Sequence, residues 1–145
     1  MPALPAVIGI EMAGHVAAVA RGTENFAIGK SALVLGTGGG RHAELTTAPA
    51  DIVTALPGDV DLEEVVCITN YAIAWCLLKE VALAPDDRTV YINGATGGVG
   101  SAAVDLARDL GMTVIAGVSS AKKCTFAAEQ GVDHTIGYSK QSAPK

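Results

Sequence analysis

Long apolar runs are missing from this 145-residue chain, although half of its residues are hydrophobic. No stretch approaches the ~18 uninterrupted apolar residues that a transmembrane helix needs, so we expect no membrane span. The apolar first twenty residues contain Glu11 and His15 and lack a basic leader, which makes them a poor secretory signal. We therefore expect a cytoplasmic protein.

Paired cysteines, aromatic residues and excess positive charge are also scarce. Cys67, Cys76 and Cys124 form no Cys-x-x-Cys pair, and an odd number of cysteines does not build a disulfide framework. Cys67 and Cys76 lie in apolar segments, so we expect them to be buried, reduced thiols. Aromatic residues make up 4% of the chain and the net charge is −5. This charge argues against a nucleic-acid partner but not against a local phosphate site.

The first sixty residues are typical of short strands joined by glycine turns. Strands are expected at 12–20, 32–35 and 43–47. Asp61 is a candidate helix N-cap, because Glu64 follows three residues later. The pattern is helical over 62–81, and we expect a break near Asn70 to divide this segment into two helices.

After residue 88 the pattern alternates between strands and helices. Strands are expected at 89–93, 113–117 and 134–136, and helices at 99–110 and 121–130. The first of these helices has Val99, Ala103, Leu106 and Leu110 on one face. Alternation of this kind predicts an α/β fold with a parallel sheet.

Residues 94–100, with the sequence GATGGVG, form a glycine-rich turn between the strand and the helix. Ala95, Gly97 and Gly100 occupy the three glycine positions of the Gly-x-Gly-x-x-Gly dinucleotide motif, with alanine in the first. Gly97 leaves room for a pyrophosphate, and Gly100 lets the helix pack closely on the strand. The free N–H groups of the first helical turn favour an anion. The alternative is a structural turn without a ligand.

The end of the second strand indicates which dinucleotide is bound. Enzymes that use NAD usually place an acidic residue there to bind the ribose 2′-hydroxyl. Here Ser119 and Ser120 are followed by Lys122 and Lys123, and no acidic residue is present. A bound 2′-phosphate would offset the cost of lysines in a first helical turn. The sequence therefore favours NADPH, and the alternative is that both lysines are merely solvated.

Several segments together resemble the medium-chain dehydrogenase/reductase superfamily, and within it the zinc-independent quinone oxidoreductase (zeta-crystallin-like) branch. The matching segments are GATGGVGSAAVDLARDLG, VIGIEMAGHVAAV, GGGRHAEL and GVDHTIGY, in the order of the family. The resemblance implies part of a GroES-like β-rich catalytic domain over 1–69. It also implies the N-terminal half of a Rossmann domain over 70–145.

The resemblance also implies roles for particular residues. The pyrophosphate would be held by the turn residues Ala95, Thr96, Gly97, Gly98, Val99 and Gly100. Lys123 matches the family lysine that contacts the 2′-phosphate, Ser119 lies beside it, and Tyr138 matches the tyrosine that flanks the same phosphate.

This sequence departs from the family at several places, among them Gly29-Lys30-Ser31-Ala32 and Asp105, which stands where glutamine is usual. Ile10 replaces the histidine that ligates zinc in zinc-dependent relatives, and Thr69 stands near the position of their second cysteine ligand. Isoleucine cannot bind zinc, so we expect no catalytic metal. The segment Ile73-Ala74-Trp75 lacks the threonine that borders the nicotinamide. The chain is also shorter than the family at both ends.

The leading hypothesis is a zinc-independent, NADPH-dependent oxidoreductase that transfers hydride to a quinone or an activated C=C bond. The alternatives are an enoyl-thioester reductase module of a polyketide or fatty-acid synthase, and a nucleotide-binding fragment without turnover. The catalytic residue is unknown. Asn70, Tyr71 and His42 are candidates, each with a structural role as the alternative. We expect a small-molecule substrate, and either a homo-oligomer or the remainder of a longer chain as partner.

Overall fold

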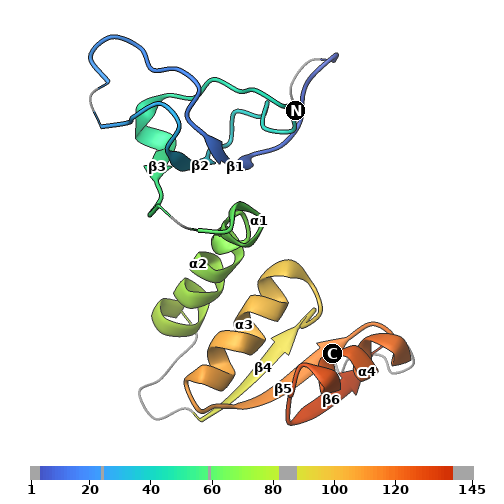
Figure 1. The fold of residues 1–145 in the computed structure, drawn as a ribbon. Coiled ribbons are helices and arrows are strands. Elements are labelled where there is room, and N and C mark those ends of the chain that lie inside the picture. The colour runs from blue at the N-terminus through green and yellow to red at the C-terminus, as the bar shows by residue number, and fades with distance from the viewer. Residues whose placement is uncertain (1–3, 24, 59, 82–87, 139–145) are drawn as a thin grey trace. The chain divides into compact units, whose positions relative to one another are not determined.

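The computed structural model describes residues 4–23, 25–58, 60–81 and 88–138 of the chain (Figure 1). The chain forms two compact units, Met1–Cys67 and Ile68–Lys145, each with its own sheet. The first sheet is antiparallel and the second is parallel. This mixture confirms the expected fold class.

The first unit is built on three short strands in the order β1-β2-β3. They are β1 (Glu11–His15), β2 (Ser31–Leu35) and β3 (Val53–Ala55). The central strand β2 is paired on both sides and carries the buried residues Ala32, Leu33 and Val34. A 3₁₀ turn, η1 (Ala50–Ile52), leads into β3.

Two strand predictions for this unit were wrong in part. The first strand ends at His15, because the neighbouring chain turns away at Gly29, where φ is +84°. Residues 43–47 are not a strand: the Thr47 carbonyl accepts a hydrogen bond from the Arg41 side chain. Pro49, which has no backbone N–H, follows closely. The third strand of the sheet is β3 instead.

The helical segment begins with a cap at Asp61, as predicted. The Asp61 carboxylate accepts hydrogen bonds from the backbone N–H groups of Glu63 and Glu64, at 2.8 and 3.4 Å. The helix α1 (Leu62–Val65) is short, and α2 (Ile68–Cys76) follows it and runs into a π-helical turn, η2 (Leu77–Val81). The break between two helices was predicted correctly, but it lies before α2 and not at Asn70.

The second unit follows the predicted alternation closely. Its elements are β4 (Thr89–Asn93), α3 (Gly98–Asp109), β5 (Thr113–Val118), α4 (Ala121–Glu129) and β6 (His134–Gly137). Both helices end before a glycine with positive φ, +71° at Gly111 and +79° at Gly131, where a side chain would be strained.

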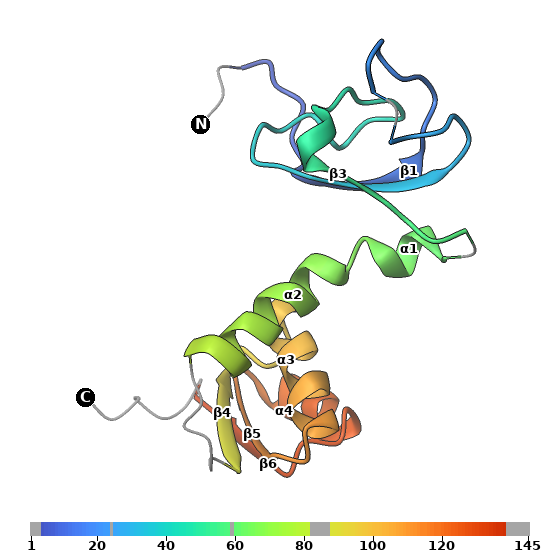
Figure 2. The ribbon, with the colours of Figure 1, turned by 90° about the vertical axis from the view of Figure 1, so that its left-hand side faces the viewer.

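Helices α3 and α4 cover the same face of the sheet β4-β5-β6 (Figure 2). The central strand β5 packs its buried Val114, Ala116 and Val118 against small helical residues such as Ala103 and Ala127. Small side chains let the helices approach the sheet closely.

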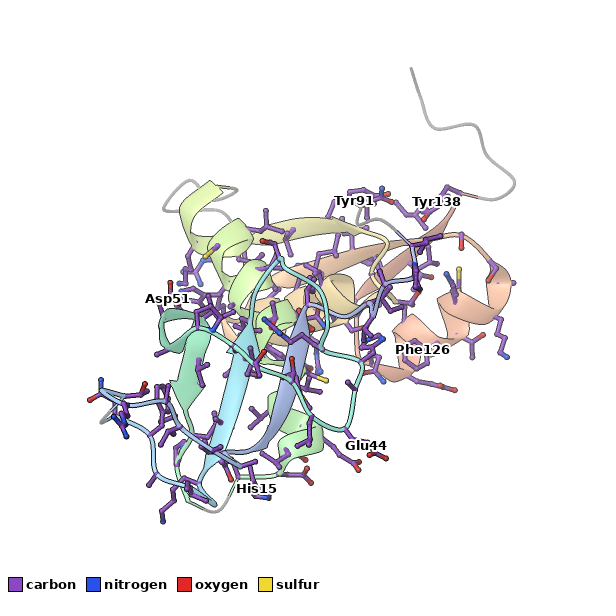
Figure 3. All side chains as sticks on the ribbon, turned by 90° about the horizontal axis from the view of Figure 1, so that it is seen from above. His15, Glu44, Asp51, Tyr91, Phe126 and Tyr138 are labelled. Carbon is purple, nitrogen blue, oxygen red and sulfur yellow. The ribbon has the colours of Figure 1, made fainter. Side chains whose placement is uncertain are left out.

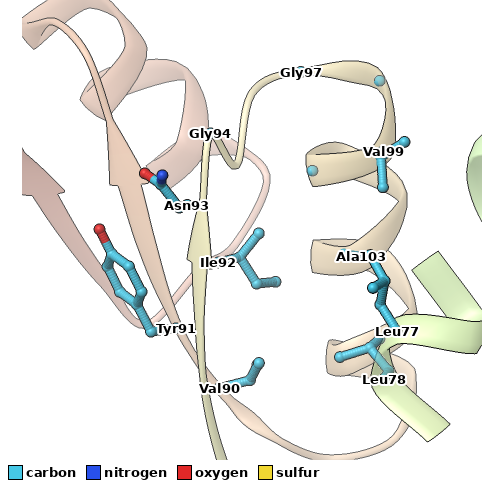
Figure 4. Close-up of a pocket in the computed structure, with 12 residues that line it drawn as sticks. Leu77, Leu78, Val90, Tyr91, Ile92, Asn93, Gly94, Gly97, Val99 and Ala103 are labelled. Carbon is cyan, nitrogen blue, oxygen red and sulfur yellow. The ribbon is translucent and has the colours of Figure 1, made fainter. Parts of the chain in front are cut away.

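The other face of the sheet bears Tyr91. On β4, Val90 and Ile92 point toward α3, whereas Tyr91 and Asn93 point away from it (Figure 4). The Tyr91 ring is 51% exposed and lies against Gly117 on β5, where a Cβ would collide with it.

Two further expectations concern the cysteines and membrane spans. Cys67 and Cys76 were expected to be buried, but both are exposed: Cys67 lies just before α2 and Cys76 is its last residue. Among the described helices, none has the length and hydropathy to cross a membrane.

Candidate cofactor-binding site

The glycine turn is fixed to the end of the neighbouring strand by backbone hydrogen bonds. The N–H groups of Gly94 and Ala95 both donate to the Gly117 carbonyl, at 2.9 and 3.2 Å. Gly94 has φ of +68°, and its carbonyl accepts a hydrogen bond from the Gly97 N–H at 2.9 Å. The turn therefore lies at the carboxyl end of both β4 and β5.

The structure explains why Gly100 must lack a side chain. A Cβ at this position would collide with the Gly94 carbonyl oxygen and would lie 2.9 Å from the Ala95 Cα. Only glycine lets the start of α3 cross the turn this closely. The Ser101 side chain, which the sequence analysis did not single out, donates to the Ala95 carbonyl at 3.4 Å and braces the same turn.

The first turn of α3 has no side-chain cap. Gly97 is the N-cap residue, and it offers no side-chain acceptor to the N–H groups that follow. Gly97 and Gly98 are exposed, so the surface over these N–H groups is open. The arrangement can bind an anion through backbone donors and the helix dipole.

The six predicted turn residues do not contribute equally. Ala95 is 3% exposed and belongs to the hydrophobic core, and its N–H is already used by Gly117. Val99 also packs against the core, and Thr96 is half-buried. Gly97 and Gly98 are the residues whose backbone is open to a ligand.

The predicted 2′-phosphate residues lie at the carboxyl ends of β5 and β6. Ser120 caps α4, since its side-chain oxygen accepts a hydrogen bond from the Lys123 N–H at 3.3 Å. The Tyr138 N–H donates to the Val118 carbonyl at 3.0 Å, which places Tyr138 beside the Ser119 backbone. Lys123 is exposed and the Tyr138 side chain is 37% exposed (Figure 3 labels Tyr138). The structure thus brings Ser119, Lys123 and Tyr138 to one edge of the sheet.

The candidate catalytic residues are divided between the two units. Asn70 lies beside the glycine turn: a Cβ on Gly98 would be 3.0 Å from its Nδ2 atom. The Tyr71 hydroxyl donates to the Asp105 carboxylate on α3 at 2.8 Å. His42 belongs to the first unit, where its N–H donates to the Ile8 carbonyl. Of these three residues, Asn70 is the one that lies against the turn.

A groove of about 440 Å³ follows β4 to the start of α3 (Figure 4). Its floor is apolar, with Leu77, Leu78 and Val90 at one end, and the glycines of the turn line the other end. An elongated ligand with an anionic centre fits such a groove, with its charge at the turn.

Ile10 and Thr69, which the resemblance places at or near the zinc ligands of other family members, do not have the side chains that usually ligate zinc. Ile10 is 53% exposed, and the Thr69 hydroxyl is enclosed and has no hydrogen-bond partner among the residues that the structure describes. Across the part of the chain that the structure describes, no three His, Cys, Asp or Glu residues gather as a metal site would require.

Comparisons with known proteins found related sequences and structures. No protein-family model matches the chain. The 2-haloacrylate reductase of Burkholderia sp. is 33% identical over 141 residues, which are 94% of this chain and 42% of that protein. A highly reducing polyketide synthase of Cryptosporiopsis sp. is 34% identical over 131 residues, which are 88% of this chain and 5% of the synthase.

The fold is also similar to that of a solved structure. The structure of Escherichia coli quinone oxidoreductase in complex with NADPH superposes with a TM-score of 0.84 and 26% identity, over 98% of this chain and 44% of that one. The chain thus spans less than half the length of these enzymes. With its glycine turn, its two sheets and these relatives, the chain is similar over nearly its whole length to a part of the quinone oxidoreductase-like proteins of the medium-chain dehydrogenase/reductase superfamily.

Proposed function

We propose that this chain carries the NADPH-binding part of an oxidoreductase that transfers hydride to a quinone or to an activated C=C bond. The observation that carries the proposal is the uncapped N-terminus of α3, where Gly97 and Gly98 leave backbone donors open. A pyrophosphate at this point satisfies those donors and complements the helix dipole. The likeness to a quinone oxidoreductase solved in complex with NADPH supports the choice of ligand.

The choice of NADPH over NADH rests on the residues after β5. Ser119, Lys123 and Tyr138 lie near the carboxyl ends of β5 and β6, where we place the ribose 2′-phosphate, and Lys123 would supply a positive charge. An acidic residue there would repel the phosphate, and none is present between Gly117 and Lys123. We infer that the site is selective for the phosphorylated dinucleotide.

Bound NADPH supplies the hydride, so the protein's own contribution is to position the reacting groups. The turn fixes the pyrophosphate through Gly97 and Gly98. Asn70 lies against this turn with its side-chain amide, a group that can both donate and accept hydrogen bonds. We assign to Asn70 the role of orienting the bound dinucleotide.

The second candidate function is an enoyl-thioester reductase module of a polyketide or fatty-acid synthase. The likeness to a highly reducing polyketide synthase favours it. Both candidates use the same cofactor site and differ in the acceptor. Turnover of NADPH with a 1,2-quinone supports the quinone reductase, whereas turnover with an enoyl-CoA supports the module. NADPH binding without either turnover supports a nucleotide-binding protein.

The test of the cofactor site is a comparison of dissociation constants for NADPH and NADH. A charge-assisted hydrogen bond contributes about 1.5–3 kcal/mol, so Lys123→Ala is expected to bind NADPH about 10–150-fold more weakly, with little change for NADH. Lys122→Ala is the matched control, because Lys122 is the exposed neighbour on the same helix. Equal affinities of the wild type for both dinucleotides would contradict the assignment.

A second variant tests the pyrophosphate position separately. In Gly97→Val the branched side chain occupies the space above the turn, and binding of both dinucleotides is expected to fall below detection. A Cβ at Gly97 lies 3.3 Å from the Gly94 carbonyl oxygen, a contact that small adjustments relieve. An unchanged circular dichroism melt would show that the variant still folds. Retained binding would place the pyrophosphate elsewhere.

A further inference from the structure

Helix α2 lies beside α3, and small apolar residues fill the space between the two helices and the sheet (Figures 1 and 2). Ala74 on α2 and Ala107 on α3 are completely buried, and Ala102 is 3% exposed. Apolar burial of this kind stabilises the pair of helices, but it is non-directional. It therefore does little to fix how α2 is rotated or shifted along α3.

Two contacts of the first turn of α2 add such a constraint. The Tyr71 hydroxyl donates to the Asp105 carboxylate on α3 at 2.8 Å. The Asn70 amide lies over Gly98, where a Cβ would be 3.0 Å from Nδ2 and 3.2 Å from Oδ1. Gly98 and Asp105 are about two helical turns apart on one face of α3, roughly 10 Å along its axis. The two contacts together place α2 along this face.

Asn70 and Tyr71 are neighbours in the chain, so a rotation or shift of this turn moves both side chains together. The hydrogen bond of Tyr71 is the directional one of the two contacts, and the carboxylate of Asp105 makes it charge-assisted. A displacement of about 1 Å takes an amide out of hydrogen-bonding range of a ligand. The place of Asn70 over α3 thus depends on the bond that its neighbour makes.

We propose that Tyr71 and Asp105 are positioning residues of the cofactor site. Their hydrogen bond holds the first turn of α2 so that the Asn70 amide stays over the N-terminus of α3, where it meets the bound dinucleotide. Tyr71 and Asp105 act through Asn70 and not by touching the dinucleotide. The inference rests on the proposed NADPH site and assigns to it a support outside the glycine turn.

The test is a double-mutant cycle in which the dissociation constants of NADPH and NADH are measured. Tyr71→Phe keeps the ring and the charge and removes the hydroxyl, so it is expected to bind both dinucleotides about three- to tenfold more weakly. The ratio of the two constants is expected to stay at its wild-type value, because the 2′-phosphate is placed at Lys123. In the Asn70→Ala background, Tyr71→Phe is expected to change neither constant by more than about twofold.

Two substitutions of Asp105 separate the hydrogen bond from the charge. Asp105→Ala and Asp105→Asn remove the same negative charge, but asparagine keeps an acceptor oxygen for the Tyr71 hydroxyl. We expect Asp105→Ala to weaken binding as Tyr71→Phe does, and Asp105→Asn to recover most of the loss. Asp109→Ala is the matched control, because Asp109 is an exposed carboxylate on the same helix, and its binding is expected to equal that of the wild type.

A second measurement needs no dinucleotide. In ¹⁵N-labelled protein the side-chain amide signal of Asn70 is identified by its loss in Asn70→Ala, and Tyr71→Phe is expected to shift or broaden it. Circular dichroism melts show that each variant is folded at the temperature of the assay.

The outcomes separate this inference from the proposed function. A folded wild type that binds neither dinucleotide would contradict the cofactor site, and this inference with it. Wild-type binding that Tyr71→Phe leaves unchanged would overturn the positioning role alone. An equal loss with and without the Asn70 amide would overturn it too, because Tyr71 would then act on stability and not through Asn70. An Asn70 signal unchanged by Tyr71→Phe would have the same meaning.

Discussion

Gly100 on α3 lies so close to the carbonyl oxygen of Gly94 that no side chain fits between them. The contact joins the start of the helix to the turn that follows β4. It is a contact between two backbones, so neither partner can move aside as a flexible side chain would.

We therefore predict that Gly100→Ala destabilises the protein by about 1–3 kcal/mol, the usual cost of forcing extra atoms into a packed region. Urea denaturation monitored by circular dichroism measures the change. Gly14→Ala in β1 is the control, because a Cβ there meets nothing within 4 Å, and we expect a change below about 0.5 kcal/mol. Equal stability of Gly100→Ala and the wild type would show that the turn is looser than the structure indicates.

The second unit was predictable because its signals are local. The strand 89–93 was predicted with the bounds that β4 has, and 113–117 falls one residue short of β5. A β-branched run, a glycine turn and a helix with one apolar face each specify their own element. The cap at Asp61 was predictable for the same reason, since its donors are two and three residues away.

The first unit was harder to predict because its strands depend on distant partners. The strand β3 has three residues, and its pairing with β2 across the sheet defines it. Residues 43–47 have a strand-like composition, but Arg41 and Pro49 hold the segment in another conformation. No local pattern in the sequence reports such contacts.

The sequence predicts which residues form the candidate site better than it predicts what each of them does. Gly97, Gly100 and Lys123 follow from the motif and from the missing acidic residue. The sequence gives no sign that Ala95 belongs to the core, or that Asn70 lies beside Gly98. Both depend on how α2 and α3 pack, which is a tertiary contact.

Two hydrogen bonds join Asp133, just before β6, to Val114 on β5, and we predict that they stabilise the protein. The Asp133 carboxylate accepts a hydrogen bond from the Val114 N–H at 2.7 Å, and the Asp133 N–H donates to the Val114 carbonyl at 3.1 Å. Val114 is completely buried, so Asp133→Ala leaves its N–H without a partner.

We expect Asp133→Ala to cost about 1–3 kcal/mol of unfolding free energy in a thermal or urea melt. Asp133→Asn keeps an acceptor oxygen and is expected to cost less. Asp109→Ala is the control, because Asp109 is exposed in the last turn of α3, where a negative charge opposes the helix dipole. Similar losses of unfolding free energy for Asp109→Ala and Asp133→Ala would mean that the hydrogen bond between Asp133 and Val114 does not stabilise the protein.

Zinc is predicted to take no part in this protein. By the family resemblance, Ile10 stands in the place of a zinc-ligating histidine and Thr69 near the place of a cysteine ligand, and an isoleucine side chain has no donor atom. Elemental analysis of protein purified without chelator is expected to give far less than one zinc per chain. Stoichiometric zinc that is lost together with activity on chelation would refute the zinc-independent assignment.

One edge of β4 is unpaired within the described residues, and it bears on whether copies of the chain associate. Among the described strands, β4 pairs with β5 alone. The Arg88 carbonyl and the Gly94 N–H bond to β5, and successive residues of a strand point to opposite edges. The backbone groups of Thr89, Tyr91 and Asn93 therefore point to the free edge, which is a template for pairing with another strand.

We predict that the isolated 145-residue chain is not a stable, active monomer, and that it associates through this edge. Thr89→Pro removes one outward N–H at the first position of the strand, where proline is tolerated, and is expected to shift the chain toward the monomer. Val90→Pro is the contrasting variant: its N–H lies on the β5 side, so proline there is expected to unfold the second unit. Size-exclusion chromatography with light scattering measures the oligomeric state of each variant. A wild-type monomer of 14.6 kDa with a cooperative melt and reductase turnover would contradict the prediction, because β4 would then need no further strand.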